Sequence, residues 1–458
     1  MTELISEELN YTPVVSNHST IVFRSVAPQG QSSVTTTATG IVGPTEFLIS
    51  PACWNPNRSR LNFTVTVPDG GTNYYNFVQG NLLSIISRIV LYDTATNAVW
   101  CDVSNCDKFY NMISAPATRL DEFLTKSYNS SAGGIATNSN PYPVEDISKC
   151  NVATANDNGA NTDVAAQNAY LSRRQWYISA ISTGDAAAGV LVLNVSIPFS
   201  AFKFTALATS KNLYCPSNLC LQVYFNANNQ FAFRGTSNTD PTAGTAAITS
   251  PAVISSISLS LATEANLSIV SQTISKVMSS GLSLPVAYPT VTRQSPGQTT
   301  APSYALQLTR GYGSRILFIA TSFFTNAGSN NTAQLHTNAG GLLTRINTKI
   351  NNVALKYPAG FDATYGQDWM YNNKDYYARS AVQTNGEYVA SEWAFIDSFF
   401  GEKPLCEVDQ HQVDGLDVSA QSSTWTVEAT TGNVAYTWIT AIIGQRQLVI
   451  SNQGSQVV

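Results

Sequence analysis

The sequence predicts an all-β protein made of two tandem eight-stranded jelly-roll β-sandwiches, a double jelly roll, with a few short helices. Its 458 residues are too many for one ordinary hydrophobic core. Apolar and polar residues alternate with a period of two in many short segments, as they do in half-buried strands. Part of this pattern recurs with an offset of about 257 positions, which indicates that the chain is built twice.

Strands account for most of the predicted elements. The first clear strand is "TIVFRSV" (20–26), and alternation predicts further half-buried strands at 61–68, 219–225, 257–262 and 424–430. More continuous apolar runs predict strands that are covered on both faces, at 189–199 and 314–324. The last long strand is expected over 435–451, with an interruption near Gly444.

Helices are expected to be few. Residues 387–404 place Val389, Trp393, Ile396 and Phe400 at helical spacing before Gly401 and Pro404. A second helix is expected over 263–281, with Thr263 as N-cap and Gly281 as terminator. Residues 106–126 are expected to form two helical turns separated by Pro116.

The remaining segments predict loops and ends. Residues 127–170 and 235–251 are small, polar and without periodicity, which is typical of long surface loops. We expect the loop at 127–170 to lie at the outer, solvent-facing end of a sandwich and to tolerate insertions. The tail at 452–458 is expected to fray.

The internal repeat centres on two arginines. The segment "SRIVLYD" contains Arg88 and "TRINTKI" contains Arg345, 257 positions later. A strand beginning near Leu61 precedes the first arginine, a strand beginning near Ile316 precedes the second, and a turn with asparagine follows each. Two duplicated β domains of about 200 residues with long loops at the sandwich ends favour jelly rolls.

Several segments carry a family resemblance in their order and spacing: "RSRLNFTVTVP" (58–68), "SRIVLYD" (87–93), "IPFSAF" (197–202), "WAFIDSFFGE" (393–402) and "STWTVEATTGNVAYTWITAIIGQRQLVIS" (423–451). From about Ser19 to Ser451, the chain resembles the double jelly-roll major capsid proteins of icosahedral double-stranded DNA viruses. This is the lineage of adenoviruses and tectiviruses. Within it, the chain is most similar to the capsid proteins of virophages and polinton-like viruses.

The resemblance implies a structural protein of the virion rather than an enzyme, with no cofactor and no catalytic or metal-binding residues. Its members form homotrimers that are pseudo-hexameric capsomers. The implied partners are neighbouring capsomers, penton and minor capsid proteins, and an internal membrane as a further candidate. The implied division is an arm at 1–18, a first jelly roll at 19–262 and a second at 263–458. The second begins with an interdomain helix and ends in a short C-terminal tail.

The arm at 1–18 is acidic and lacks strong alternation. Its three glutamates are Glu3, Glu7 and Glu8, and they argue against contact with DNA phosphates. We expect Leu4, Ile5 and Leu9 to enter apolar grooves of partners during assembly. The arm has neither the basic region nor the apolar run of a secretory signal.

Composition narrows the function further. Only 12% of residues are charged, about half the usual ~25%, which suits surfaces that neighbouring subunits cover. A net charge of −5 and a single adjacent basic pair, Arg173–Arg174, predict no specific nucleic-acid binding. Seven scattered cysteines predict reduced thiols, because a disulfide framework needs a secretory context.

The main alternative function is a carbohydrate-binding or adhesin-type β-sandwich protein. Residues 364–380 gather Trp369, Tyr371, Tyr376 and Tyr377, which fit an aromatic platform as well as core or intersubunit packing. A third class is a β-sandwich glycosidase, which needs a pair of catalytic carboxylates. The candidates for that pair are Glu387, Glu392 and Asp397, which lie close together in the sequence.

Other polar groups favour structural roles over chemistry. His411 lies near Glu407, Asp409 and Asp414 without metal-ligand spacing, so a polar loop is expected. The pairs Cys101/Cys106 and Cys215/Cys220 are expected to be buried apolar residues rather than zinc ligands. Residues 156–163 are expected to form a loop rather than a calcium site. The sequons at Asn62 and Asn194 lie inside predicted strands.

Overall fold

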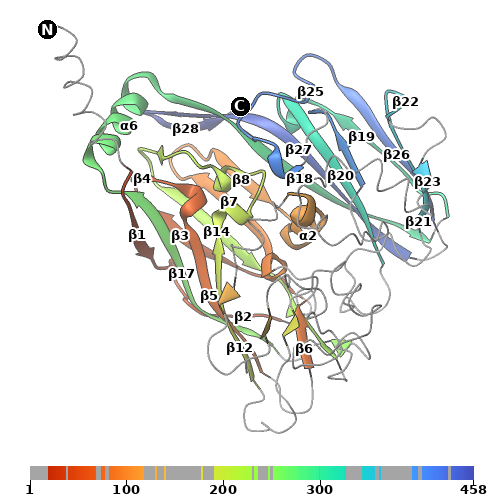
Figure 1. The fold of residues 1–458 in the computed structure, drawn as a ribbon, viewed down its shortest axis with the longest axis horizontal. Helices are drawn as coiled ribbons and strands as arrows, with labels where there is room; N and C mark the ends of the chain where they lie inside the picture. Colours follow the sequence, from red (N-terminus) through yellow and green to blue (C-terminus); the bar gives the residue numbers. More distant parts are fainter. Residues whose placement is uncertain are drawn as a thin grey trace, which may run out of the picture.

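A computed structural model gives the conformation of most of the two predicted sandwiches. It describes residues 19–37, 40–68, 74–77, 82–117, 129–130, 139–140, 177–178, 190–228, 232–235, 246–247, 251–298, 300–325, 343–355, 361–362, 395–400, 405–431 and 435–458. Strands of the first half of the chain occupy one side of the molecule and strands of the second half the other (Figure 1).

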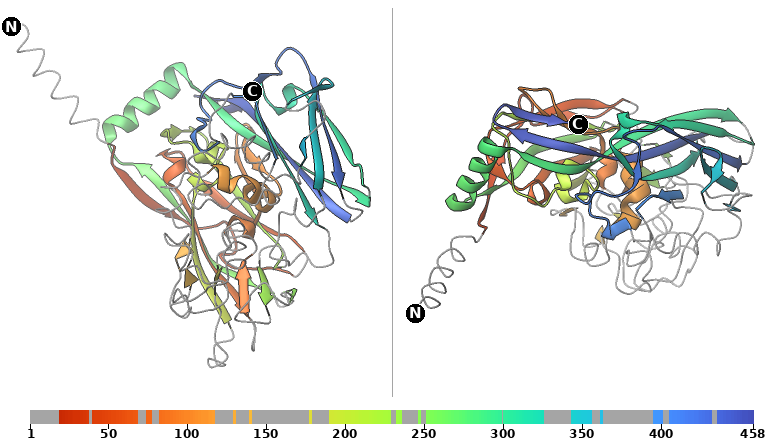
Figure 2. Two further views of the ribbon diagram at one scale, coloured as in Figure 1. Left: turned by 45° about the vertical axis from the view of Figure 1, so that its right-hand side comes forward. Right: turned by 90° about the horizontal axis from the view of Figure 1, so that it is seen from above.

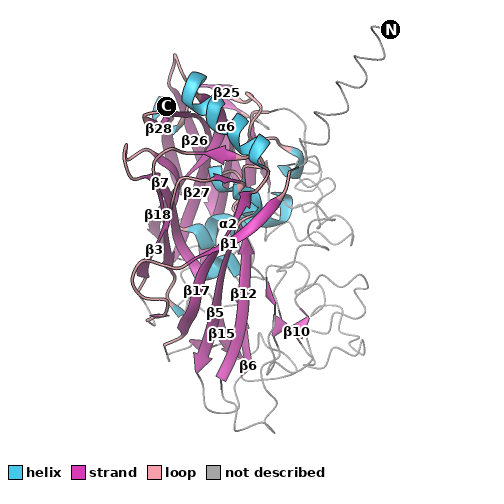
Figure 3. Ribbon diagram, turned by 90° about the vertical axis from the view of Figure 1, so that its left-hand side faces the viewer, coloured by secondary structure: helices cyan, strands magenta, loops and turns pink. Residues whose placement is uncertain are grey.

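One sheet of the first half consists mainly of four antiparallel strands that lie side by side (Figure 3). They are, in spatial order, β1 (Ile21–Val26), β17 (Val253–Glu264), β5 (Arg60–Pro68) and β12 (Val190–Pro198). Short strands extend this sheet: β2 (Val34–Thr35), β4 (Cys53–Trp54), β9 (Asn129–Ser130) and β13 (Leu213–Tyr214). The predicted strands at 20–26, 61–68, 189–199 and 257–262 are confirmed.

The facing sheet of the first half has the order β3 (Val42–Ile49), β14 (Leu219–Phe225), β7 (Ile86–Asp93) and β8 (Val99–Val103). Side chains from both sheets form the core, with Phe47, Leu61, Phe63 and Leu91 buried. Two smaller sheets contain β6 (Tyr74–Phe77), β15 (Ala232–Gly235) and β16 (Ala246–Ala247), and β10 (Ser139–Asn140) with β11 (Tyr177–Ile178).

The second half repeats this plan. Its first sheet has the order β18 (Leu282–Gln298), β27 (Ala435–Ser451), β20 (Arg315–Thr325) and β24 (Phe395–Ser398), with β25 (Leu416–Asp417) and β28 (Gly454–Val457) at its margins. Its second sheet has the order β19 (Ser303–Leu308), β26 (Ser423–Thr431), β21 (Leu343–Ile350) and β22 (Val353–Ala354), with β23 (Phe361–Asp362) paired to β21.

Eight strands of each half therefore follow the same plan in sequence and in space. The order β1-β17-β5-β12 corresponds to β18-β27-β20-β24, and β3-β14-β7-β8 corresponds to β19-β26-β21-β22. Arg88 lies on β7 and Arg345 on β21, which are corresponding strands. The turns that follow them contain Asn97 and the pair Asn351–Asn352, all at positive φ. The repeat that the sequence indicates is thus a repeat of topology, and the fold is all-β with two eight-stranded sandwiches.

The two α-helices in the described part of the chain differ in detail from the sequence prediction. Helix α2 (Cys106–Ala117) includes Pro116 in its last turn, so the described residues form one helix there and not two separated turns. Helix α6 (Leu267–Ser280) begins at the N-cap Asn266, whose side chain accepts from the Ser268 nitrogen at 3.0 Å. The predicted N-cap, Thr263, belongs instead to β17, because its backbone pairs with β1. Gly281 ends the helix with φ 72°, as predicted.

Short 3-10 helices connect several strands of both halves: η1 (Pro56–Arg58), η3 (Leu82–Ile85), η5 (Phe199–Ala201), η6 (Ala206–Ala208), η7 (Arg310–Tyr312) and η10 (Leu405–Glu407). No helix in the described part of the chain is long and apolar enough to cross a membrane.

The helix expected over 387–404 is wrong where the structure describes it. Residues 395–398 form β24, whose backbone pairs with β20 and whose Phe395, Ile396 and Asp397 are buried. Residues 387–394 and 401–404 lie outside the described residues. The spacing of apolar residues favoured a helix because it contains no information about a neighbouring strand. Backbone pairing with β20 overrode this local preference.

Two expectations about the C-terminal region are also corrected. Strand β27 runs without a break through Gly444, where a Cβ atom would collide with the carbonyl oxygen of Tyr312. The tail does not fray, because β28 (Gly454–Val457) pairs with β27, and Val458 exchanges two backbone hydrogen bonds with Gln447.

The cores of the two halves meet. Phe204 of the first half packs edge-on against Phe318 on β20, with ring centroids 4.9 Å apart. Phe318 in turn contacts Phe400, at 6.2 Å. Helix α2 lies where the halves meet (Figure 1), close to both β7 and β20. One continuous cluster of buried apolar residues thus extends through both sandwiches.

Candidate functional site

The clearest polar contact between the halves is a cluster around Asp93, at the end of β7. Asp93 is fully buried, and its Oδ2 accepts from the backbone nitrogen and the hydroxyl of Ser455 on β28, both at 2.8 Å. Its Oδ1 accepts from the Ser217 hydroxyl at 2.6 Å and from the Ala95 nitrogen at 2.9 Å. The C-terminal hairpin is therefore fastened to the first sandwich.

These donors determine the charge state of the Asp93 carboxyl. Burial alone would raise the pKa of Asp93, but the hydrogen bonds from Ser217, Ala95 and Ser455 outweigh it and lower the pKa to about 2. Trp100 adds to the cluster, since its indole nitrogen donates to the Ser455 hydroxyl at 2.7 Å. The Asp93 carboxylate fits a structural role, because four hydrogen bonds occupy its two oxygens and its low pKa makes it a weak base.

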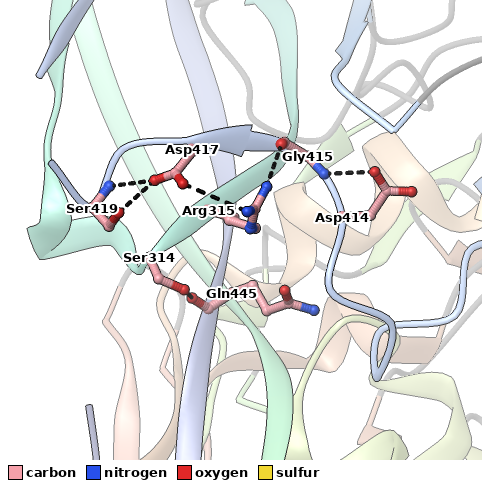
Figure 4. Close-up of polar contacts among 7 residues, drawn as sticks. All are labelled: Ser314, Arg315, Asp414, Gly415, Asp417, Ser419 and Gln445. Atoms are coloured by element: carbon pink, nitrogen blue, oxygen red, sulfur yellow. Dashed lines mark hydrogen bonds and ion pairs between the residues drawn. The ribbon is translucent and has the colours of Figure 1, made fainter. Parts of the chain in front are cut away.

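A second polar cluster fixes the segment 405–419 to the second sandwich (Figure 4). Arg315 donates to the Gly415 carbonyl at 3.2 Å and contacts Asp417 at 3.5 Å. Asp417 also accepts from the hydroxyl of Ser419 at 2.6 Å and from its nitrogen at 2.9 Å. Gly415 has φ 98°, and a Cβ there would collide with the Ile316 carbonyl, so only glycine fits.

His411 lies in this segment and takes part in local hydrogen bonds. Its Nδ1 lies 2.8 Å from the Pro285 carbonyl oxygen, and its backbone nitrogen donates to Asp409 at 2.9 Å. Asp414 accepts from the Gly415 nitrogen at 2.8 Å. These contacts fit a polar loop, and in the part of the chain that the structure describes no three potential ligands cluster around a metal-sized space.

Five cysteines are buried free thiols: Cys53, Cys101, Cys106, Cys215 and Cys220. Burial raises the pKa of the Cys101 and Cys106 thiols, and it raises the pKa of Cys215 to about 11. Protonated thiols in apolar surroundings are poor nucleophiles and poor metal ligands. The burial predicted for these two cysteine pairs is thus confirmed.

The outer face of the β17–β5–β12 sheet carries a hydrogen-bonded row of mostly neutral side chains. Asn62 donates to Ser260 at 2.8 Å and accepts from Ser196 at 2.6 Å, and Thr64 donates to Asn194 at 2.8 Å. Arg60 donates to the Ser196 hydroxyl at 2.7 Å. The two sequons lie within paired strands, as predicted. Such a low-charge face loses little solvation when another subunit covers it.

Large apolar side chains are exposed at the margin of the first half. On β1, Val22 is 48% and Phe23 57% exposed, and on α6, Leu267 is 81% and Met278 48% exposed. Both elements lie at the left margin of the molecule in Figure 1. Successive strand residues point to opposite faces, so β1 presents apolar groups on both of its faces. An edge strand of this kind is a ready surface for another chain.

Two cavities lined by described residues each combine segments that are distant in the sequence. One, of about 200 Å³, lies between the halves and is lined by Lys203, Phe204, Gln410 and His411 among others. The other, of about 410 Å³, lies in the second half beside η7 and the β27–β28 hairpin, and Arg310 and Arg446 line it. Sequence reasoning identified neither cavity, since each combines residues from distant segments.

Several predicted features lie outside the described residues. They include the arm residues Leu4, Ile5 and Leu9, the aromatic cluster at 364–380, Glu387 and Glu392, the segment 156–163 and nearly all of the loop at 127–170. Asp397, the third candidate carboxylate, accepts from Thr348 at 2.9 Å and from the Trp425 indole at 3.0 Å inside the second core.

The strand order and the paired sandwiches define a double jelly roll, the architecture of viral major capsid proteins. No family model and no curated protein matches the chain. Among solved structures, the chain is similar to the mavirus major capsid protein, with a TM-score of 0.51 and 9% identity over 95% of this chain and 90% of that one.

Two structures of the virus PBCV-1 have a similar fold. PBCV-1 VP54, fitted into a reconstruction of the virophage Sputnik, is similar with a TM-score of 0.51 and 11% identity, over 96% of this chain and 97% of that one. A chain of the PBCV-1 virus capsid is similar with a TM-score of 0.52 and 10% identity over the same shares. At these identities the likeness concerns the fold, and it extends over almost the whole length of each chain.

Proposed function

We propose that the protein is the major capsid protein of an icosahedral double-stranded DNA virus. It would trimerise into pseudo-hexameric capsomers and tile the shell of the virion. The observation that carries the proposal is the match of nearly the whole chain to the double jelly rolls of the mavirus and PBCV-1 capsid proteins. Both halves are required for that match, and two similar sandwiches per chain would give a trimer six similar parts.

The surface of the first sandwich supports this role. The sheet face around Asn62 and Ser196 is low in charge and internally hydrogen-bonded, which lowers the cost of covering it. Exposed apolar side chains at Phe23 and Leu267 would contribute favourable burial in contacts between subunits. Buried free thiols and a buried, hydrogen-bonded carboxylate at Asp93 fit a structural protein better than an enzyme.

The proposal extends to domains and partners. Residues 19–262 and 263–458 would be the two jelly-roll domains, and the arm at 1–18 would act in assembly through Leu4, Ile5 and Leu9. Neighbouring capsomers, penton and minor capsid proteins would be the partners, with an internal membrane as a further candidate. The loop at 127–170 would face outward. The acidic arm and a net charge of −5 argue against specific binding of nucleic acid.

The native mass of the purified protein tests the proposal. A capsomer has three copies of the 49.2 kDa chain, and a shell is far larger. A carbohydrate-binding protein or adhesin, the alternative function, would be a monomer or another small oligomer that binds glycans. Light scattering that gives a monomer mass over a range of concentrations and salt would contradict the capsid role.

A further inference from the structure

A cavity of about 410 Å³ concentrates positive charge in the second half of the chain. Its walls come from η7, from the end of β27 and from β28 with the residue after it, and its charged residues are Arg310 and Arg446. Ser314 adds a hydroxyl, and Val457 and Val458 form an apolar part of the wall. We call this the arginine cavity.

One of the two guanidinium groups is held in a fixed orientation. Arg446 donates from Nη2 to the Gly311 carbonyl at 2.7 Å, and its guanidinium carbon lies 3.8 Å from the centre of the Tyr288 ring. A stacked and hydrogen-bonded guanidinium has lost much of its side-chain freedom already, so it binds a further acceptor at a lower entropic cost. Arg310 is exposed on η7 at the cavity.

Neither arginine has an acidic partner in the described part of the chain. Some other basic side chains there do have one: Arg88 with Asp102 at 2.6 Å, Lys349 with Glu428 at 2.8 Å, and Arg315 with Asp417 at 3.5 Å. No such pair includes Arg310 or Arg446. Two guanidinium groups that make no ion pair among the described residues line one cavity, and together they can bind a carboxylate through charge-assisted hydrogen bonds.

The chain itself contains a segment of complementary chemistry. Residues 1–18 include Glu3, Glu7 and Glu8 and no lysine or arginine, and Leu4, Ile5 and Leu9 lie between or beside these glutamates. Acidic and apolar groups interleaved in this way match a cavity of two arginines beside Val457 and Val458. The exposed fraction of Val458 is 60%, so apolar surface is available there.

The place where this segment begins suits the same end of the molecule. Ser19 and Thr20 are tied to Glu264, at 2.6 and 2.8 Å, immediately before helix α6. Helix α6 and strand β28 both lie at the upper end of the molecule in Figure 1 and in the left view of Figure 2. Eighteen extended residues span at most about 60 Å, enough to pass from one copy to an adjacent one.

We propose that the arginine cavity receives residues 1–18 of a neighbouring copy of the chain. A glutamate of that segment lies between Arg310 and Arg446, and its apolar residues cover Val457 and Val458. The inference rests on the proposed assembly into a shell, which it deepens by naming the receiving surface. Because the contact is largely ionic, it weakens as the salt concentration rises.

The test is the binding of a labelled synthetic peptide of residues 1–18 to the full-length protein before assembly, followed by fluorescence anisotropy. We expect saturable binding, and a Kd raised at least about tenfold when the three glutamates of the peptide are glutamine. The peptide variant leaves the protein unchanged, so a folding defect cannot produce this result. Arg310→Gln should weaken binding to a similar extent, whereas Arg58→Gln, an exposed arginine of the first half, should leave the Kd unchanged.

Three results would overturn the inference. The first is equal binding of the acidic and the glutamine peptides, and the second is equal binding to Arg310→Gln and to the unchanged protein. The third is the absence of peptide binding. This result counts against the inference also when the protein's own residues 1–18 cover the cavity, and when inorganic phosphate binds there but the peptide does not. The native mass of the same samples separates this failure from that of the proposed function, because trimers without peptide binding refute only the arginine cavity.

Discussion

Asp93 on β7 and Ser455 on β28 lie 362 positions apart in the sequence, yet Asp93 Oδ2 accepts two hydrogen bonds from Ser455, each at 2.8 Å. This contact joins the end of the second sandwich to the first. It makes the C-terminal hairpin part of the folded unit, and it predicts that changes at either residue alter the stability of the whole chain.

Asp93→Asn should lower the free energy of unfolding at pH 7 by about 2 kcal/mol, because the ionised carboxylate that accepts hydrogen bonds from Ser217, Ala95 and Ser455 is lost. Asp102→Asn is a matched control on the adjacent β8. Its ion pair with Arg88 is partly exposed and should contribute less than about 1 kcal/mol. Urea unfolding followed by tryptophan fluorescence measures both, and equal effects would contradict the role of Asp93.

The same carboxyl predicts a pH dependence with a defined sign. The pKa of Asp93 is lowered from 3.8 to about 2 in the folded protein. Its contribution is therefore fully present above pH 3.8, and it is lost as the pH falls through about 2. Unfolding curves between pH 2 and 5 should show a smaller loss of stability on acidification in Asp93→Asn than in the unchanged protein. Identical slopes would refute the assignment.

Gly454→Ala should destabilise the hairpin contact. Gly454 has φ 108°, and a Cβ there would lie 2.7 Å from the Thr96 methyl group and 3.1 Å from Asp93 Oδ2. Gly30→Ala is the control, since Gly30 has φ 101° and open space around a Cβ. Both variants incur backbone strain of order 1 kcal/mol, and only Gly454→Ala should lose more. Equal melting temperatures of the two variants would argue against a close fit at Gly454.

Phe23→Ser and Leu267→Ser should leave the isolated protein as stable as before and impair its assembly. Both side chains are more than half exposed, at 57% and 81%, so little packing is lost within the chain. Thermal melting checks the first expectation and sedimentation of assembled particles the second. Normal yields of shells from both variants would show that this margin of the first sandwich is not a contact between subunits.

Deletion of residues 1–17 should spare trimers and prevent efficient shell closure. The first described residues, Ser19 and Thr20, keep their contacts with Glu264 in such a variant, so the sandwich retains its own boundary. Sedimentation of the truncated protein at low and high concentration measures both states. If the truncated chain fails to trimerise, the segment belongs to the fold and is not an assembly arm.

Much of the fold could be predicted from local pattern. Alternation located β5 and β14 within one residue of their ends, and the arginines at 88 and 345 marked corresponding strands of the two halves. These signals are local because each strand must bury one face, and the period of two is set by the backbone. The repeat was visible because β7 and β21 each contain an arginine at corresponding positions and are each followed by a turn with asparagine at positive φ.

The polar contacts between the halves could not be predicted in this way. The sequence around Ser455 reads as a polar tail, and only the approach of β28 to Asp93 gives it a partner. Ile396 fits a helical period, but its backbone pairing with Ala320 on β20, some 75 positions away, makes it part of a strand. The arginine cavity likewise combines Arg310 and Arg446, whose proximity depends on the packing of η7 against β27.

Electron microscopy of the purified native protein tests the central claim most directly. If three double jelly rolls form a capsomer, class averages viewed along the symmetry axis should show a threefold particle with a pseudo-hexagonal outline, alone or within closed shells. Class averages that show only single chains or twofold particles, at concentrations at which the protein is folded, would contradict the account.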